Sequence, residues 1–210
     1  MEILAHRGLW EKDEEKNTFV SLKKALINGF GIETDIRDYN GEIVITHDPY
    51  LETADKLLLK DLLEFYANNN YVSTLALNIK SDGLQSMLRS ELDFYGIENY
   101  FLFDMSFPEQ YQYVNKGFTV FSRQSEFEKQ ISMYDRVTGI WMDEFDISWI
   151  TKDSIECHLK EGKKVGVISS ELHGRNEETL WNVLHEMKNY SGLMLCTDKP
   201  LEAQRLYGED

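Results

Sequence analysis

Short apolar runs alternate with amphipathic stretches along almost all of the 210 residues. Each run is apolar at consecutive positions, which is typical of strands that are buried on both faces of a parallel sheet. The pattern therefore predicts a series of buried strands. They cover residues 3–5, 31–36, 43–46, 75–79, 100–103, 118–121, 139–142, 164–168 and 193–196.

Between these runs, apolar residues recur at the spacing of helices. The first predicted helix begins at Asn17-Thr18-Phe19 and ends at Gly29. Four of its residues are expected to share one buried face, namely Phe19, Leu22, Leu26 and Ile27. Further helices are predicted over residues 57–66, 85–95, 108–115, 154–161, 178–188 and 200–206.

Strand–helix alternation repeated about eight times indicates an α/β fold, a TIM-like (β/α)₈ barrel, with a doubly wound open sheet as the alternative. The run 43–46 follows the turn Asn40-Gly41 so closely that we expect an extra hairpin there, outside the eight strands. Because no linker or low-complexity stretch interrupts the pattern, we expect residues 1–210 to form a single domain.

Composition excludes several classes of protein. Hydrophobic residues make up 42% and charged residues 28%, so the chain can bury a core. There are 22 Lys+Arg and 37 Asp+Glu, and 22 − 37 gives a net charge of −15, which disfavours binding to nucleic acid or to an anionic membrane. The sequence contains neither an apolar membrane span nor a signal-peptide pattern, and its two cysteines indicate no disulfide framework. We therefore expect a cytoplasmic protein without stable membrane association.

Polar side chains stand at the carboxyl ends of several predicted strands. In a parallel α/β barrel all these strand ends open on the same face, so residues far apart in sequence would converge there. The residues concerned are His6-Arg7-Gly8, Glu33 and Asp35, His47-Asp48, and Asn78 and Lys80.

Glu33 and Asp35 are two positions apart on a predicted strand, so their carboxylates point to the same side. Two such carboxylates would repel each other unless a cation offsets their charge, and Mg²⁺ or Ca²⁺ suits oxygen ligands. The alternative is that they form ion pairs with Arg7 and Arg37.

His6 and His47 would allow one side chain to accept a proton while the other delivers one near neutral pH. The alternative is a pair of hydrogen-bonded structural histidines. Arg7 and Lys80 supply the fixed positive charge that a phosphate needs, unless they form salt bridges with the nearby carboxylates.

The motifs, taken together and in order, resemble the glycerophosphodiester phosphodiesterase family. The family pattern is HRG, then ENT or a close variant, then E-x-D, a short turn and HD. This chain carries it as His6-Arg7-Gly8, Glu15-x-Asn17-Thr18, Glu33-x-Asp35 and His47-Asp48, with Thr197-Asp198-Lys199-Pro200 resembling the closing T-D-x-P. The resemblance spans nearly the whole chain and is strongest over residues 3–49.

The resemblance implies a metal-dependent hydrolase that splits a small-molecule phosphodiester into an alcohol and a phosphomonoester. It implies that His6 and His47 are the general acid and base, and that Arg7 and Lys80 hold the phosphate. A neighbouring hydroxyl of the substrate would attack phosphorus, and water would open the resulting cyclic phosphate. The sequence fits this chemistry, since no Ser, Thr or Cys stands out as an activated nucleophile.

The chain departs from the family at the third metal ligand. The family pattern has Glu-x-Lys where this chain has Asn78-Ile79-Lys80. The resemblance therefore implies a metal site of Glu33, Asp35 and Asn78, with one negative charge fewer. Asp104 and Asp143 each follow a predicted strand and are candidates to compensate; we expect Asp143 to do so, the alternative being that either caps the following helix.

A second departure follows the strand 164–168. The segment 169–175 replaces an aromatic-rich family segment, and we expect Glu171 and Arg175 there to recognise substrate, unless they only form a salt-bridged loop. The short stretch between His47 and Asn78 leaves little room for a lid. Four aromatic residues are candidates to line the open mouth or to belong to the core: Tyr39, Tyr50, Phe107 and Trp141.

Two other functions remain in view. A related phospholipase-type barrel would act on a lipid phosphodiester, although no apolar loop in the sequence suits a lipid surface. A catalytically weak barrel would only bind a phosphorylated ligand, which the substitution at Asn78 favours and the presence of both His6 and His47 disfavours.

Overall fold

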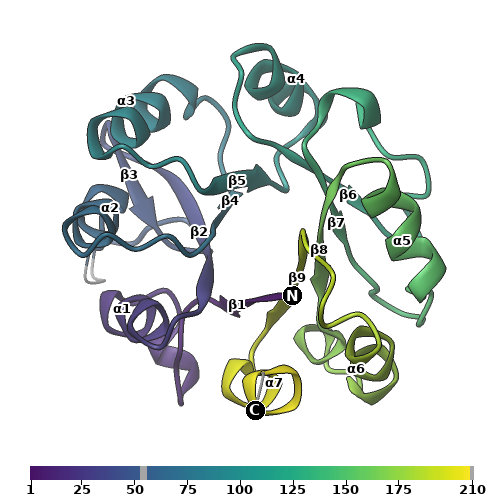
Figure 1. The fold of residues 1–210 in the computed structure, drawn as a ribbon. Coiled ribbons are helices and arrows are strands. Elements are labelled where there is room, and N and C mark those ends of the chain that lie inside the picture. Colours follow the sequence, from purple (N-terminus) through teal and green to yellow (C-terminus); the bar gives the residue numbers. More distant parts are fainter. Residues whose placement is uncertain (53–55, 209–210) are drawn as a thin grey trace. The chain divides into compact units, whose positions relative to one another are not determined.

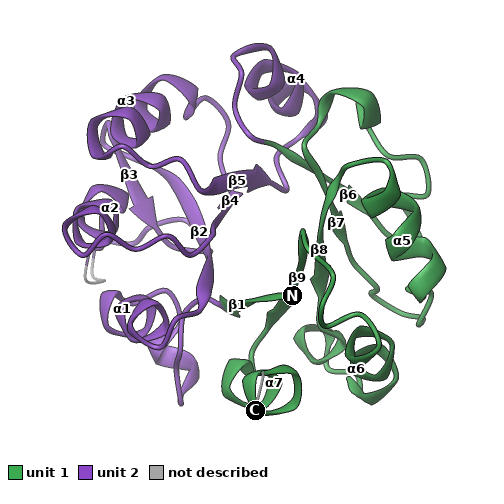
Figure 2. Cartoon of the chain, viewed as in Figure 1, with its two compact units in different colours: residues 1–5, 120–210 green, residues 6–119 purple. Residues whose placement is uncertain are grey.

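The computed structural model describes residues 1–52 and 56–208. It divides into two compact units, which Figure 2 shows in different colours. Unit 1 combines residues 1–5 with residues 120–210, and unit 2 is the continuous stretch 6–119. The expectation of a single domain over residues 1–210 stays a prediction.

Unit 2 is built on three parallel strands, with β4 (Leu75–Ile79) between β2 (Gly31–Tyr39) and β5 (Tyr100–Phe103). The register places Asp35 of β2 beside Asn78 of β4. The helices of this unit lie on one side of the strands (Figure 1). They are α1 (Phe19–Ile27), α2 (Leu59–Asn68), α3 (Gln85–Tyr95) and α4 (Phe107–Asn115), and a 3₁₀ turn covers Asp13–Glu15.

Unit 1 contains five parallel strands in the order β1-β9-β8-β7-β6. Their bounds are β1 (Glu2–His6), β6 (Phe121–Gln124), β7 (Gly139–Met142), β8 (Lys164–Ile168) and β9 (Leu193–Thr197). The helices are α5 (Lys152–Lys160), α6 (Glu178–His185) and α7 (Pro200–Tyr207), and 3₁₀ turns cover Tyr134–Arg136 and Ser170–His173. β1 pairs directly with β9, so the first strand of the chain lies beside the last.

The predicted extra hairpin is confirmed. β3 (Glu42–Ile45) pairs antiparallel with the outer half of β2, and Asn40 and Gly41 form the turn with φ of 50° and 77°. Positive φ at both turn positions matches the right-handed twist of the strands, which is why Asn-Gly is favoured there. The hairpin extends β2 beyond the ends of β4 and β5, above the polar residues described below.

Two details of the predicted elements are wrong. Ile27 lies on the outside of α1 and is 60% exposed, because the buried face of that helix is formed by Ser21, Leu22, Ala25 and Leu26. The strand expected over residues 118–121 begins only at Phe121. Gly117 ends α4 with φ +72°, and Phe118 then packs edge-on against Tyr113 instead of entering the sheet.

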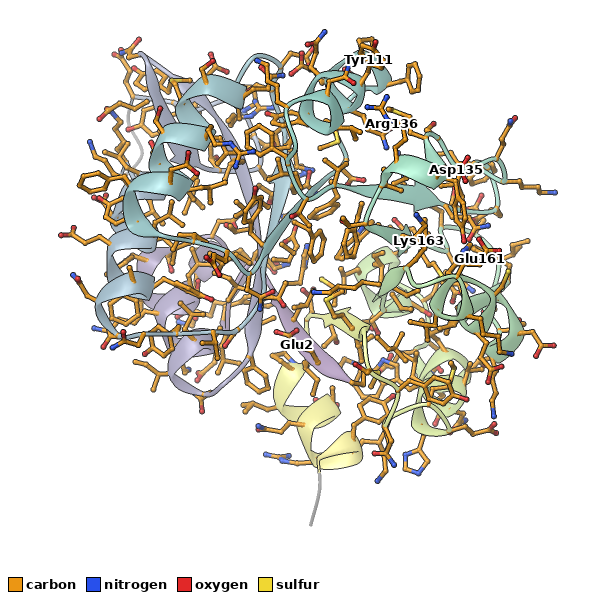
Figure 3. All side chains as sticks on the ribbon, turned by 45° about the horizontal axis from the view of Figure 1, so that its top comes forward. Glu2, Tyr111, Asp135, Arg136, Glu161 and Lys163 are labelled. Atoms are coloured by element: carbon orange, nitrogen blue, oxygen red, sulfur yellow. The ribbon has the colours of Figure 1, made fainter. Side chains whose placement is uncertain are left out.

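In unit 1, Tyr134 lies among polar side chains from neighbouring elements. Its hydroxyl lies 3.0 Å from Nδ1 of the buried His158, and Nζ of Lys163 lies 5.0 Å from the centre of its ring. Glu161 and Lys163 are labelled in Figure 3 at the turn between α5 and β8. Burial, followed by the charge of Glu161, raises the pKa of Tyr134 to about 12. Nε2 of His158 lies 2.9 Å from Gln124 Oε1, so this histidine links structural elements.

None of the helices in the described part of the chain is long and apolar enough to cross a membrane.

Candidate functional site

The turn after β1 is fixed by its glycine. Arg7 and Gly8 both have positive φ, 55° and 96°. A Cβ atom on Gly8 would lie 2.6 Å from the backbone carbon of Ser21 in α1, so only glycine lets the turn approach the helix this closely. The amide of Arg7 donates to the carbonyl of Glu33 over 2.9 Å, which ties the turn to β2.

Asp35 is the centre of a charged cluster in unit 2. It is fully buried, and three polar side chains surround its carboxylate. Arg7 Nε lies 2.9 Å from Oδ2, and Lys80 Nζ lies 3.2 Å from Oδ1. Asn17 donates from Nδ2 to Oδ2 over 2.8 Å and accepts a hydrogen bond from Thr34 at its own Oδ1. The alternative of ion pairs between the site carboxylates and Arg7 or Lys80 is therefore realised at Asp35.

Glu33 lies on the same face of β2 and is 2% exposed. Burial, followed by the negative charge of Asp35, raises the pKa of Glu33 to about 7. Nε2 of His6 lies 3.8 Å from Oε2 of Glu33. Glu33 is therefore a buried carboxyl group whose charged form is disfavoured by its surroundings and would be stabilised by a nearby cation.

Asn78 connects two carboxylates. Its Nδ2 donates to Oε1 of Glu33 over 3.4 Å and to Oδ2 of Asp104 over 3.2 Å. Its own Oδ1 is buried and has no hydrogen-bond partner among the described residues. Of the two aspartates considered as compensating ligands, Asp104 therefore lies beside the cluster.

His47 lies at the exposed rim of unit 2. Its side chain is 46% exposed, and Nδ1 lies 2.9 Å from Oδ1 of Asp48. The amide of Thr46 donates to the carbonyl of Asp35 over 3.0 Å, so the segment leading to His47 is fixed to the strand that carries the cluster. The hydrogen bond from His47 lowers the pKa of Asp48, and the charges of Arg37 and Arg7 lower it further.

Three predicted residues lie in unit 1 and contact other residues there. Oδ1 of Asp143 lies 2.7 Å from Nε2 of His173, and this hydrogen bond raises the pKa of His173. Arg175 donates to the carbonyl of Glu144 over 2.9 Å. Glu171 accepts hydrogen bonds from Ser169 Oγ, Thr197 Oγ1 and the amide of Asp198. The proposed roles of Asp143, Glu171 and Arg175 stay predictions.

Sequence reasoning assigned no catalytic or ligand-binding role to two side chains of the unit 2 site, Asn17 and Arg37. Asn17 belongs to the family-like motif, but its contact with Asp35 joins positions 18 apart. Arg37 entered only as an ion-pair partner for the carboxylates, whereas the structure gives it a hydrogen bond to the carbonyl of Lys80. The sequence could have indicated that Arg37 belongs to the site, because alternate residues of a strand point to the same side and Arg37 therefore shares a face with Glu33 and Asp35.

The donor atoms of this site suit a hard divalent cation in part. Glu33 Oε2 and Asn78 Oδ1 are buried without a hydrogen-bond partner in the described part of the chain. Oxygen donors of this kind are those that Mg²⁺ and Ca²⁺ take. Within residues 1–52 and 56–208, however, no group of three or more His, Cys, Asp or Glu side chains could hold a metal ion. An ion here would depend on the amide oxygen of Asn78 and would share Asp35 with Arg7 and Lys80.

The sequence matches no protein-family model and no curated protein. Solved structures, in contrast, resemble the chain along its length. A protein from Galdieria sulphuraria assigned to the glycerophosphodiester phosphodiesterases superposes with a TM-score of 0.80 at 17% identity, covering 99% of this chain and 98% of that one.

Two further solved structures are similar to this chain over nearly its whole length. A glycerophosphodiester phosphodiesterase from Agrobacterium tumefaciens str. C58 gives a TM-score of 0.69 at 17% identity, covering 95% and 97% of the two chains. An Oleispira antarctica phosphodiesterase in complex with the product sn-glycerol-3-phosphate gives 0.73 at 16% identity, covering 100% and 97%. The predicted fold is thereby confirmed: the chain has the TIM-like (β/α)₈ barrel fold of solved glycerophosphodiester phosphodiesterases.

Proposed function

We propose that the protein hydrolyses a small glycerophosphodiester-like molecule to an alcohol and a phosphomonoester. The observation that carries the proposal is the buried Asp35, which holds Arg7 and Lys80 beside His6 and Glu33. This arrangement combines fixed positive charge with a proton-transfer group, as phosphoryl chemistry requires. The Oleispira antarctica neighbour, solved with sn-glycerol-3-phosphate, supports a phosphomonoester product.

His6 and His47 exchange protons with the reacting oxygens in this proposal. One imidazole accepts the proton of the glycerol hydroxyl next to the phosphodiester, and that oxygen attacks phosphorus. The other imidazolium donates a proton to the departing alcohol oxygen as its bond to phosphorus breaks. In the second step of the reaction the two histidines exchange roles. One now accepts a proton from the water that attacks the cyclic phosphate, and the other donates a proton to the ring oxygen that leaves phosphorus.

Arg7 and Lys80 bind the non-bridging phosphate oxygens. Both side chains are already oriented by Asp35, so little rotational freedom is lost when a phosphate reaches them. The guanidinium can donate to two oxygens at once, whereas the ammonium acts as a point charge. Their charges also allow an anionic substrate to approach a protein with a net charge of −15.

A divalent Mg²⁺ or Ca²⁺ ion would be held by Glu33, Asp35 and Asn78. Bound there, it would supply Lewis-acid stabilisation of charge on the phosphate oxygens. Asp104, which accepts from Asn78 Nδ2, adds a negative charge next to this set. With Asn78 in place of a carboxylate, we expect weaker affinity for the ion than a site with three carboxylates would have.

We also propose a cytoplasmic protein that acts on soluble phosphodiesters. Cys157 and Cys196 are not joined to each other, and a reducing compartment keeps cysteines in the thiol form. The net charge of −15 does not favour an anionic lipid surface.

The test measures hydrolysis of a chromogenic phosphodiester and of a panel of glycerophosphodiesters with Mg²⁺, Ca²⁺, Mn²⁺ or EDTA. We expect turnover that EDTA abolishes, and a loss of roughly 10²–10⁴-fold in His6→Ala and in His47→Ala. His185→Ala is the matched control, because the side chain of this exposed histidine on α6 contacts only the ring of Tyr207 in the described part of the chain. Unchanged turnover in both site variants would contradict the assignment.

A catalytically weak binding barrel is the second candidate, and Asn78 favours it. Its amide group already contacts Glu33 and Asp104, and each oxygen of Asp35 faces a cation. Calorimetric titration with sn-glycerol-3-phosphate separates the two candidates. Binding without turnover under any metal condition supports the binding barrel, whereas binding retained in His47→Ala with turnover lost supports the enzyme.

A further inference from the structure

Arg37 occupies the next position of the β2 face that carries the site. Glu33, Asp35 and Arg37 follow one another at intervals of two residues, so their side chains point the same way, with roughly 7 Å between successive members. Glu33 and Asp35 are buried, whereas Arg37 is half-buried. Arg37 therefore follows the charged cluster along β2, toward the carboxyl end of that strand.

The guanidinium of Arg37 is held in place by the site itself. Its Nη2 donates to the carbonyl of Lys80 over 2.9 Å. The amide of Lys80 donates to Ile36, and its Nζ pairs with Asp35, so Lys80 is fixed at both ends. The orientation of Arg37 thus depends on the same residue that we propose to bind the phosphate.

Among the described residues, Arg37 forms no close ion pair with a carboxylate, although its charge acts on Asp48 and lowers the pKa of that carboxyl group. Arg7 and Lys80 each form an ion pair with Asp35. Arg37 makes no ion pair with a carboxylate in the described part of the chain, and its Nε is shielded from solvent without an acceptor. A partly desolvated guanidinium without a close carboxylate is stabilised by an anion on its outer N–H groups.

The outer end of the same face suits the other part of a substrate. Tyr39 follows Arg37 by two residues, donates to Oε1 of Glu52 over 2.9 Å and lies 4.4 Å from the ring of Tyr50. Aromatic rings and a carboxylate are the groups that attract an ammonium ion. Nζ of Lys56 already lies 5.6 Å from the centre of the Tyr39 ring. Glu52 and the ring of Tyr50 therefore suit the amine that common alcohol head groups share, whereas Arg37 suits only a head group that carries an anion.

We propose that Arg37 binds a carboxylate on the alcohol part of the substrate, so that the enzyme prefers a glycerophosphodiester of a hydroxy amino acid over one of a simple amino alcohol. The inference rests on the proposed function and specifies its substrate class. The phosphate is held by Arg7 and Lys80, and the carboxylate lies one step further out along β2.

Glycerophosphoserine and glycerophosphoethanolamine test this directly, because they differ by one carboxylate. We expect the wild type to have a higher kcat/KM on glycerophosphoserine. In Arg37→Gln, kcat/KM should fall about tenfold on glycerophosphoserine and less than twofold on glycerophosphoethanolamine. Arg89→Gln, which removes an arginine from α3 that pairs with Asp93, is the matched control and should change neither value.

Other outcomes overturn the inference. An equal loss on both substrates would show that Arg37 acts on the shared phosphate, and no loss on either would show that it has no role in recognition. Circular dichroism shows whether Arg37→Gln folds. If it does not, Arg37→Lys, which keeps the positive charge, is tested in its place. This variant should retain part of the preference for glycerophosphoserine over glycerophosphoethanolamine.

Failure of the proposed function gives a different result. If the wild type hydrolyses neither compound, both stay intact and can be titrated calorimetrically against the wild type and Arg37→Gln. Tighter binding of glycerophosphoserine that is lost in the variant supports the role of Arg37 in the absence of catalysis. Equal affinities for the two compounds overturn it.

Discussion

Gly8 combines two separate requirements in one residue of the HRG motif. Its φ of +96° lies in a region that side chains rarely adopt, and the space that a Cβ atom would fill is occupied by Ser21. Gly29 has a similar φ of +82°, but nothing lies within 4 Å of its Cβ position. Replacing each glycine by alanine therefore distinguishes two costs: at Gly29 the substitution causes backbone strain alone, and at Gly8 it causes strain and steric overlap.

We expect Gly8→Ala to lower the free energy of unfolding by about 2–4 kcal/mol, since strain and overlap both act. Gly29→Ala should lower it by about 1 kcal/mol, from strain alone. Urea unfolding followed by circular dichroism measures both. Equal losses in the two variants would mean that the contact with Ser21 relaxes without cost.

The residues of the site could be predicted from sequence only where a local motif exists. His6, Arg7, Glu33, Asp35 and Lys80 stand in recognisable short patterns, and the structure brings them together in unit 2. The contact of Asn78 with Asp104 joins residues 26 positions apart, and that of Arg37 with Lys80 joins residues 43 apart. Such contacts depend on the register of neighbouring strands, which no single segment of sequence specifies.

At the scale of the elements, helix α1 shows how an apolar pattern can mislead. Leu26 and Ile27 are adjacent apolar residues near its end, yet Leu26 is 1% exposed and Ile27 is 60% exposed. A helix turns by about 100° per residue, so only one of two neighbours can point fully into the core. The small residues Ser21 and Ala25 take the place on the buried face that Phe19 and Ile27 were expected to fill.

We expect Leu26→Ala to cost about 2–5 kcal/mol of stability, because it leaves a cavity in the core. Ile27→Ala should change stability by less than about 1 kcal/mol, since the side chain is mostly in water and alanine favours the helix. The midpoints of urea unfolding give the comparison. A cost at Ile27 close to that at Leu26 would show that this face of α1 is covered in solution.

The strands and helices themselves were more predictable than their ends. Runs such as residues 75–79 and 139–142 are apolar at each or nearly each position, which the two-sided burial of a parallel strand requires. The start of β6 was displaced because Phe118 packs back against Tyr113 across the end of α4, a contact that the apolar run alone does not reveal. The hairpin at Asn40-Gly41 was predictable because its turn chemistry is local.

At the scale of the whole molecule, the charge of −15 acts against compaction. Like charges spread over the surface repel one another, and salt screens this repulsion over a distance of about 10 Å at 0.1 M. Salt also weakens attractive ion pairs. Several of these pairs join exposed side chains, such as Lys24 with Glu11, and contribute little to the stability of the fold. Net repulsion should therefore dominate the response to salt.

We expect the Tm at pH 7.5 to rise by roughly 2–5 °C when KCl is increased from about 0.01 to 0.2 M in the presence of EDTA. At pH 5, close to the sequence pI of about 4.7, the net charge is small and the rise should shrink. Differential scanning calorimetry measures both series. A Tm that falls with salt at pH 7.5 would show that ion pairs outweigh the repulsion.

The pairing of β1 with β9 also determines when these two strands can join during synthesis of the chain. Glu2 lies beside Met194, 192 positions later, so β1 cannot pair with β9 until the residues between them have been made. At about 5–20 residues per second, that wait is roughly 10–40 s. The sequence of unit 2 is continuous and is complete by residue 119, whereas unit 1 needs both early and late residues. Until β9 has been made, the apolar residues of β1 therefore lack this neighbour and are open to binding by chaperones.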